Sequence, residues 1–234
     1  MLKSIYHSLY KSAEKLNTRN ICTALSTTGP HPRLLDVGCN DGVNTQVWAQ
    51  AATATTVYGI EPVKSVIPQA KKNHIRVLSI AADQGTWPLD NNSIDCIVSN
   101  QVIEHLSHVD HFISECHRVL VSGGTVVTST PNLASWHNIA ALTLGWAPFD
   151  LANSSQKSWG IGNPLSAHTS ESDPRGGTWT HKCVYTSRWL AQWFELYGFK
   201  HLHTYGSGYY PFPAELGQID VNHGAFMTLV GRKI

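Results

Sequence analysis

The chain has 234 residues and a formal net charge of +1, from 17 Lys and Arg against 16 Asp and Glu. This length can bury the core of one large α/β domain, and a hydrophobic content of 42% excludes global disorder. The balanced charge argues against a protein that binds duplex nucleic acid mainly through its phosphates. Because only 14% of the residues are charged, the histidines and aromatic residues become important candidates for recognition and chemistry.

The five cysteines are scattered, and no two of them form a CxxC pair. Their spacing argues against a zinc ribbon and against a disulfide framework. The N-terminus has no apolar leader, and no window approaches the roughly 18 apolar residues of a membrane span. We therefore expect a reduced, cytoplasmic protein without a membrane span.

The first predicted element is an amphipathic helix over residues 1–28. From residue 33 to 130, short β-like runs alternate with segments of helical length. Strands are predicted at 33–37, 56–60, 76–82, 94–99 and 125–130, and helices at 43–51, up to 70, and at 109–120 with Ser107 as N-cap. This alternation implies βαβ units and a mostly parallel sheet.

The pattern changes after residue 132. Residues 151–180 are rich in Ser, Asn, Gly and Pro and show no periodicity, so we interpret 133–182 as an insertion that covers a cleft. A helix capped by Thr186 or Ser187 and ended by Gly198 follows, with closing strands near 200–205 and 225–231. The sequence shows no internal repeats and no sign of a separate second domain. Residues 1–234 are therefore expected to form a single domain.

A Gly-rich turn joins the first strand to its helix, in the arrangement Asp36-x-Gly38-x-x-x-Gly42, with Asn40 inside the turn. Such a turn lets a ligand approach the backbone and the N-terminal N–H groups of the helix. The carboxylate of Asp36 would repel a pyrophosphate, which disfavours a dinucleotide. It suits a ligand with an amine and a sulfonium, such as S-adenosylmethionine.

Acidic residues also follow the next two strands. Glu61 can accept hydrogen bonds from ribose hydroxyls, and Asp83, with Gln84 beside it, can accept from an adenine amino group. Each residue alone could be a turn cap or a solvated strand end. Three acidic residues at successive strand ends favour a ligand site, because open α/β sheets bind ligands at that edge.

These motifs resemble those of class I S-adenosylmethionine-dependent methyltransferases. The resemblance rests on residues 34–42 (LLDVGCNDG), 59–61 (GIE) and 94–100 (IDCIVSN), and it continues through 102–106 (VIEHL) and 129–132 (STPN). It implies a Rossmann-like, doubly wound, seven-stranded sheet whose last strand is antiparallel. It also implies S-adenosylmethionine as cofactor, S-adenosylhomocysteine as product, and cofactor contacts from Asp36, Gly38, Glu61, Asp83 and Asn100. Asn40 departs from the resemblance, because many members have Gly there.

His105 is the first candidate for a catalytic base. It follows the fourth strand at the edge of the expected cleft, and methyl transfer to an oxygen benefits from a nearby base. Imidazole titrates near neutrality. The alternative is that His105 has only a structural role.

A divalent metal is an open alternative at the same place. Gln101, Glu104 and His105 would share a helical face, and His181 comes after the long loop. The resemblance extends to ubiquinone-pathway O-methyltransferases and small-RNA 2′-O-methyltransferases, some of which bind a cation through a Glu-x-x-Glu-His motif. Gln101 is a weaker ligand than Glu, and many relatives use no metal, so no metal ligand is assigned from the sequence.

The expected acceptor is a small molecule, most simply one methylated on oxygen, and nucleic acid is not expected. Tryptophans in the insertion favour an aromatic or apolar acceptor under a lid, and two histidines there are alternative bases; these residues are Trp136, Trp146, Trp159, Trp179, His137 and His168. Two other functions stay open: metal-dependent RNA 2′-O-methylation, and cofactor binding without catalysis. The sequence does not predict the oligomeric state.

Overall fold

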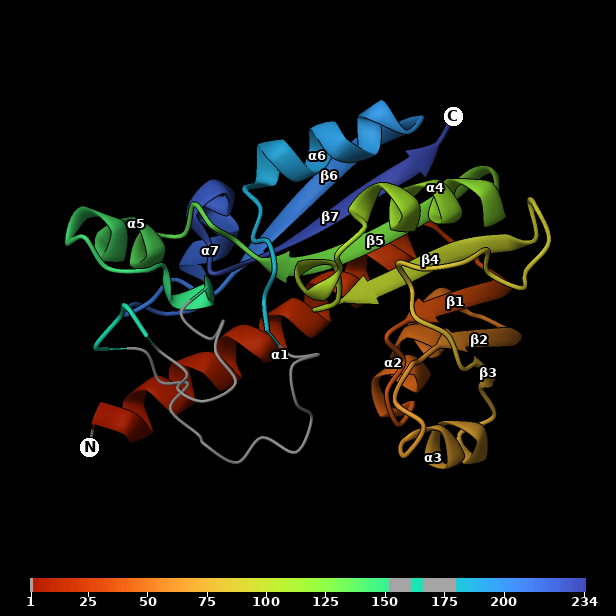
Figure 1. Ribbon diagram of the computed structural model, residues 1–234, viewed down its shortest axis with the longest axis horizontal. Coiled ribbons are helices and arrows are strands. Elements are labelled where there is room, and N and C mark those ends of the chain that lie inside the picture. Colours follow the sequence, from red (N-terminus) through yellow and green to blue (C-terminus); the bar gives the residue numbers. More distant parts are fainter. Residues whose placement is uncertain (1, 152–160, 166–179) are drawn as a thin grey trace.

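A seven-stranded sheet forms the centre of the protein in the computed structural model, which describes residues 2–151, 161–165 and 180–234. The strand order is β3-β2-β1-β4-β5-β7-β6 (Figure 1). The strands are β1 (Arg33–Val37), β2 (Thr56–Ile60), β3 (Arg76–Leu78), β4 (Ile94–Asn100), β5 (Leu120–Pro131), β6 (Phe199–Ser207) and β7 (Phe226–Lys233).

The pairing of the strands confirms the expected topology. β1 pairs in parallel with β2 and β4, β2 with β3, and β4 with β5. β7, the last strand, is antiparallel to both β5 and β6. The carboxyl ends of β1 to β5 therefore meet at one edge of a Rossmann-like sheet.

Helices cover both faces of this sheet. They are α1 (Leu2–Thr28), α2 (Val43–Ala52), α3 (Ile67–Lys72), α4 (Val109–Val119), α5 (Trp136–Thr143), α6 (Ser187–Leu196) and α7 (Leu216–Ile219). Short 3₁₀ helices are η1 (Ile103–His105), η2 (Phe149–Leu151) and η4 (Val221–His223). In Figure 1, α4 and α6 lie on the same side of the sheet, and α1 passes behind it.

The side chains of the strands explain this doubly wound arrangement. Leu35 packs in the cluster that contains Phe112 of α4 and Phe194 of α6. Its neighbour Leu34 points the other way and packs with Leu25 of α1 and Trp48 of α2. Successive residues of a strand face opposite sides, so the continuous apolar run of β1 fills two cores.

Three local predictions were wrong. The fifth strand, predicted over 125–130, already begins at Leu120, directly after α4. The third strand ends at Leu78 instead of continuing to residue 82. Ser107 does not cap α4: the N-cap position is His108, without a side-chain cap bond, and Asp83 Oδ2 accepts the backbone N–H groups of Ser107 and His108 at 2.7 and 3.4 Å. A carboxylate from a distant loop thus holds the backbone that leads into α4, and its negative charge lies near the helix N-terminus.

The predicted lid lies partly outside the described residues. Trp159, His168 and Trp179 fall in the ranges 152–160 and 166–179, which the structure does not describe. Within the described part, Trp136 begins α5 and is 45% exposed. The lid interpretation of 133–182, like the single-domain interpretation of 1–234, stays a prediction.

Candidate functional site

The Gly-rich turn after β1 is held in a conformation that requires glycine. Gly38 has φ +82°, and a Cβ built on it would lie 2.5 Å from Val102 Cγ2. Gly42 has φ +85° at the N-cap of α2, where a Cβ would collide with Ile75. Left-handed backbone at both positions excludes larger side chains. The turn therefore stays close to the carboxyl edge, with the N-terminus of α2 beside it.

Asp36 is buried beneath this turn, with an exposed fraction of 3%. Its Oδ2 accepts a hydrogen bond from Thr45 Oγ1 at 2.6 Å. Burial raises the pKa of Asp36 to about 7, the hydroxyl of Thr45 lowers it in part, and the nearby Glu61 raises it. A positive ligand beside Asp36 would favour the ionised form of its carboxyl group.

Glu61 connects the second strand end to the Gly-rich turn. Its Oε2 accepts the backbone N–H of Asn40 at 2.9 Å, and its Oε1 accepts that of Val63 at 2.8 Å. Each oxygen keeps a further lone pair. Asn40 adopts a left-handed backbone conformation with φ +47°. Its contribution to the predicted site in this structure is the backbone N–H that it donates to Glu61.

The third acidic residue has a structural partner as well. Asp83 is buried and holds the backbone that leads into α4 through one carboxylate oxygen. Gln84 beside it is exposed. Their predicted contact with adenine stays a prediction, and the contact with this backbone explains independently why position 83 is acidic.

Asn100 ends β4 and lines a cavity of about 360 Å³. Asn44 of α2 and Gln101 line the same cavity, and residues of α1 between Tyr10 and Thr18 close it. The Nε2 atom of Gln101 is buried and has no hydrogen-bond partner among the described residues. Amides, the N-terminal turn of α2 and the charged residues Lys11, Glu14 and Lys15 of α1 give this cavity a polar lining that can hold a polar ligand.

The sequence interpretation missed the contribution of α1 to this cavity. It treated residues 1–28 only as an amphipathic helix, although Asn17 and Asn20 lie among its apolar residues. Asparagine is a poor helix former. Two asparagines next to the apolar residues of this helix were therefore a signal in the sequence for specific polar contacts of α1. The structure confirms that both are buried.

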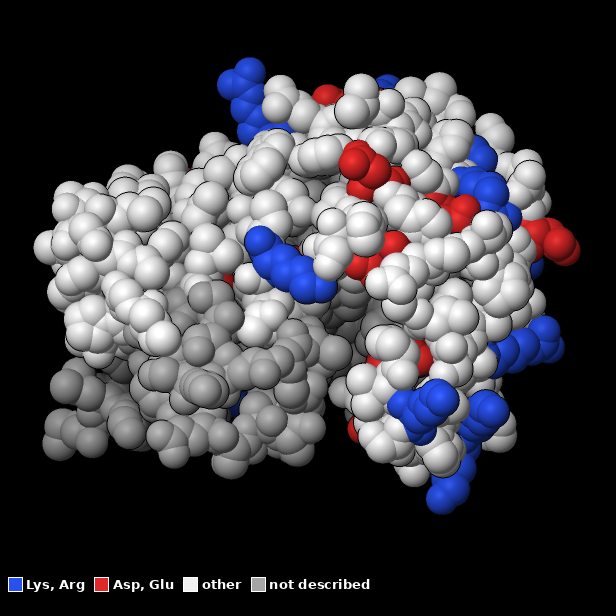
Figure 2. Space-filling model, in the orientation of Figure 1, with Lys and Arg blue, Asp and Glu red and all other residues white. Residues whose placement is uncertain are grey.

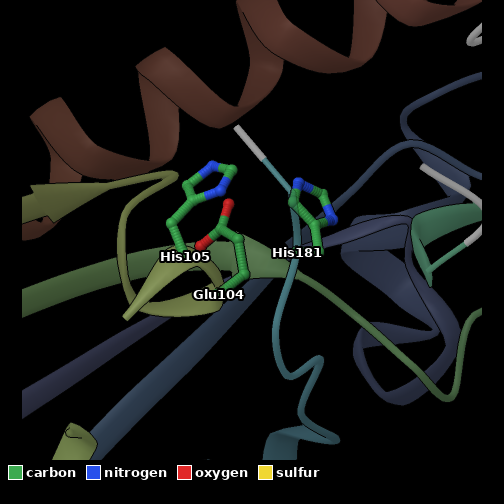
Figure 3. Close-up of side chains that lie close together, drawn as sticks. All are labelled: Glu104, His105 and His181. Atoms are coloured by element: carbon green, nitrogen blue, oxygen red, sulfur yellow. The ribbon is translucent and has the colours of Figure 1, made fainter. Parts of the chain in front are cut away.

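Beside the cavity lies a second group of side chains: Glu104, His105 and His181 (Figure 3). One ligand atom from each lies within 4.8 Å of the others. The rings of His105 and His181 contact edge to face, with centroids 4.8 Å apart. Glu104 and His105 come from η1, whereas His181 arrives from the segment before α6, so residues distant in sequence converge here.

Hydrogen bonds orient each member of this group. Glu104 is fully buried; its Oε2 accepts from Thr130 Oγ1 at 2.9 Å, while its Oε1 has no hydrogen-bond partner in the described part of the chain. His105 Nδ1 faces the carbonyl of Thr180 at 3.3 Å, and His181 Nδ1 faces that of Asp150 at 2.5 Å. Because a carbonyl can only accept, each neutral imidazole carries its proton on Nδ1 and its lone pair on Nε2.

The surroundings also set the protonation of these groups. Burial, followed by the positive charge that His181 can carry, lowers the pKa of His105 to about 4. Burial raises the pKa of Glu104 to about 8. At neutral pH, His105 is therefore a neutral imidazole that can accept a proton or bind a cation.

Gln101 does not share a helical face with this group. It has φ +57° and lies before η1, which begins at Ile103. The predicted spacing Gln101, Glu104, His105 is therefore wrong as a helical argument. In the structure, Glu104 and His105 lie close together, and His181 lies close to both.

Comparison of the sequence with known proteins identifies the family of the chain. A methyltransferase domain family matches residues 10–204. The chain is 34% identical to a probable S-adenosylmethionine-dependent methyltransferase of Mycolicibacterium smegmatis over 42% of this chain and 38% of that protein. It is 32% identical to the mitochondrial ubiquinone biosynthesis O-methyltransferase of Mus musculus over 43% of this chain and 29% of that protein.

The fold also resembles that of solved methyltransferase structures. A solved S-adenosylmethionine-dependent methyltransferase from Thermotoga maritima superposes with a TM-score of 0.63, covering 98% of this chain and 94% of that chain at 16% identity. This likeness shows the fold. The alignments with the two curated relatives span less than two fifths of the length of either one.

Proposed function

Since the chain belongs to the class I S-adenosylmethionine-dependent methyltransferases, we propose that it transfers a methyl group to an oxygen atom of a small-molecule acceptor. S-adenosylmethionine, the cofactor of this family, supplies the methyl group on a sulfonium, which is an excellent leaving group. The protein therefore has to bind both reactants, align them and accept a proton.

The observation that carries the proposal is the adjacency of two groups after β4. Asn100 ends the strand and lines the cavity in which we place part of the cofactor. His105 follows in η1, with a neutral ring that is oriented by the contact of Nδ1 with the carbonyl of Thr180. This arrangement supports a cofactor site and a base within one short stretch of backbone.

Within the proposed site, each residue has a separate task. Asp36, Glu61 and the turn from Gly38 to Gly42 hold the cofactor. Glu104, fixed by Thr130, places a carboxyl group close to the His105 ring. His105 takes the proton from the acceptor hydroxyl as the oxygen attacks.

The surface supports a weakly charged acceptor. In Figure 2 the charged side chains of this face lie mainly over the half that contains α3 and α4, and few of the described residues around α5 and α7 are charged. Exposed apolar side chains there include Trp136, Leu142 and Phe212. An aromatic or apolar acceptor is therefore part of the proposal.

The test uses labelled S-adenosylmethionine and a panel of phenols, catechols and carboxylic acids. We expect label in at least one acceptor, and a His105→Ala variant should lower kcat by about 10²-fold or more with cofactor affinity unchanged. His203→Ala, which removes an exposed histidine of β6, is the matched control. Full turnover in His105→Ala would remove the base role, and a panel without label would contradict oxygen transfer to small molecules.

A second candidate is the same transfer assisted by a divalent cation. The carboxylate of Glu104 and the imidazoles of His105 and His181 are ligand types that suit a cation such as Zn²⁺ or Mn²⁺, and one ligand atom from each lies within 4.8 Å of the others. A cation held there would lower the pKa of an acceptor hydroxyl. The buried Oε1 of Glu104 supports this candidate, because such an atom ordinarily has a partner.

Metal content and calorimetry distinguish the two candidates. If a cation is held, the wild type should bind about one equivalent of Zn²⁺ or Mn²⁺, and Glu104→Gln and His181→Ala should each weaken binding by about tenfold or more. Chelation should then reduce turnover. Equal cation binding by the wild type and both variants would contradict this candidate and leave His105 as the base.

RNA 2′-O-methylation and cofactor binding without transfer both stay predictions. Methylation of RNA would use the same Glu104, His105 and His181 group, but the near-zero net charge disfavours it. Cofactor binding without transfer is what remains if no acceptor is labelled. None of the described helices combines the length and the apolar composition needed to cross a bilayer; cytoplasmic localisation stays a prediction.

A further inference from the structure

Among the residues that the structure describes, the buried Asn17 of α1 makes three side-chain hydrogen bonds to the sheet. It is 5% exposed. Its Oδ1 accepts hydrogen bonds from Ser129 Oγ at 2.7 Å and Thr228 Oγ1 at 2.9 Å, and its Nδ2 donates to Asn100 Oδ1 at 3.0 Å. One helical side chain therefore joins residues of β4, β5 and β7.

These bonds fix the amide orientation of Asn100. Because Asn100 Oδ1 accepts from Asn17, its Nδ2 is the atom left to donate to other groups. Both asparagines line the cavity of about 360 Å³. Asn100 can thus offer an N–H to an acceptor atom of a bound ligand only while its oxygen faces Asn17.

We propose that Asn17 is a positioning residue of the cofactor site, which acts by holding the Asn100 amide with its NH₂ group available to the cofactor. The inference rests on the proposed function, since it takes Asn100 as a cofactor contact. In this proposal, α1 forms part of the cofactor site. The proposal also gives a reason for an asparagine on the buried face of this helix.

The chain provides a matched control one turn further along α1. Asn20 is 2% exposed and donates through Nδ2 to the carbonyl of Gly206 at 3.1 Å. It also anchors α1 to the sheet, but it does not line the cavity. Asn17→Ala and Asn20→Ala each remove a buried amide of α1, and only the first touches Asn100.

The readout is the affinity for S-adenosylhomocysteine, measured by calorimetry on proteins whose unfolding temperatures are recorded in parallel. Asn17→Ala should weaken binding about three- to tenfold, the value of one hydrogen bond, while Asn20→Ala binds like the wild type. Asn17→Asp at pH 8 keeps acceptors for Ser129 and Thr228 but cannot donate to Asn100, so it should weaken binding at least as much. Equal weakening by Asn17→Ala and Asn20→Ala would overturn the inference.

A double-mutant cycle tests whether Asn17 acts through Asn100. In an Asn100→Ala background, Asn17→Ala should cause no further loss of affinity, because the coupled group is gone. Additive losses, or an Asn100→Ala variant that binds normally, would overturn the inference. The measurement needs no acceptor, so a protein that binds the product but methylates nothing would contradict the proposed function and leave this result intact.

Discussion

Single carboxylates in this site combine a structural role with a proposed ligand role. Glu61 holds the Gly-rich turn through Asn40 and its own strand end through Val63. Asp83 holds the backbone that leads into α4, and Asp36 accepts from Thr45 at the start of α2. A structural role and a ligand contact are therefore compatible at these positions. A substitution of one of these residues can lower stability as well as ligand affinity, so both have to be measured.

Asp36 predicts a pH dependence of stability in the unliganded protein. Its pKa is about 7 in the folded state and roughly 3.9 in an unfolded chain. The folded protein keeps this proton while the unfolded chain loses it, so the contribution of Asp36 to stability falls as the pH rises from about 4 to 7 and is constant above that window. The loss is at most about 1.4 kcal/mol for each pH unit.

Denaturant unfolding of the wild type and Asp36→Asn at several pH values checks this sign. Asn still offers an oxygen to Thr45 but does not titrate. The stability difference between the two proteins should shift in favour of Asp36→Asn as the pH rises through the window. Parallel curves would contradict a raised pKa at Asp36.

At the scale of elements, the sequence predicted the parts that local pattern determines. The apolar runs of β1, β2 and β4 and the helical spacing in α4 and α6 depend on neighbouring residues, and the structure confirms them. The antiparallel last strand came from the family resemblance and is also confirmed.

The errors concern contacts between distant segments. Ser107 was the expected local cap of α4, but Asp83 reaches from another loop to the backbone N–H groups of Ser107 and His108, just before the helix. The sequence also could not show that Asn17 of α1 would meet Asn100, or how closely His181 would approach Glu104. Such pairings depend on packing of whole elements, which no periodicity encodes.

For the whole molecule, the carboxyl edge of the sheet organises two adjacent regions. The turn after β1, the end of β2 and the cavity under α1 form the proposed cofactor region. The group of Glu104, His105 and His181 forms the proposed reaction region beside it. Four of the 16 acidic residues of the chain, Asp36, Glu61, Asp83 and Glu104, belong to these two regions.

The most direct test of the proposed cofactor site is a calorimetric titration of S-adenosylmethionine into the wild type and Glu61→Ala. We predict saturable binding with one site in the wild type, and a loss of about tenfold or more in affinity for Glu61→Ala, because the turn and the ribose hydroxyls lose the same carboxylate. Wild-type protein that binds no cofactor, or a Glu61→Ala variant with unchanged affinity, would contradict the assignment of the site.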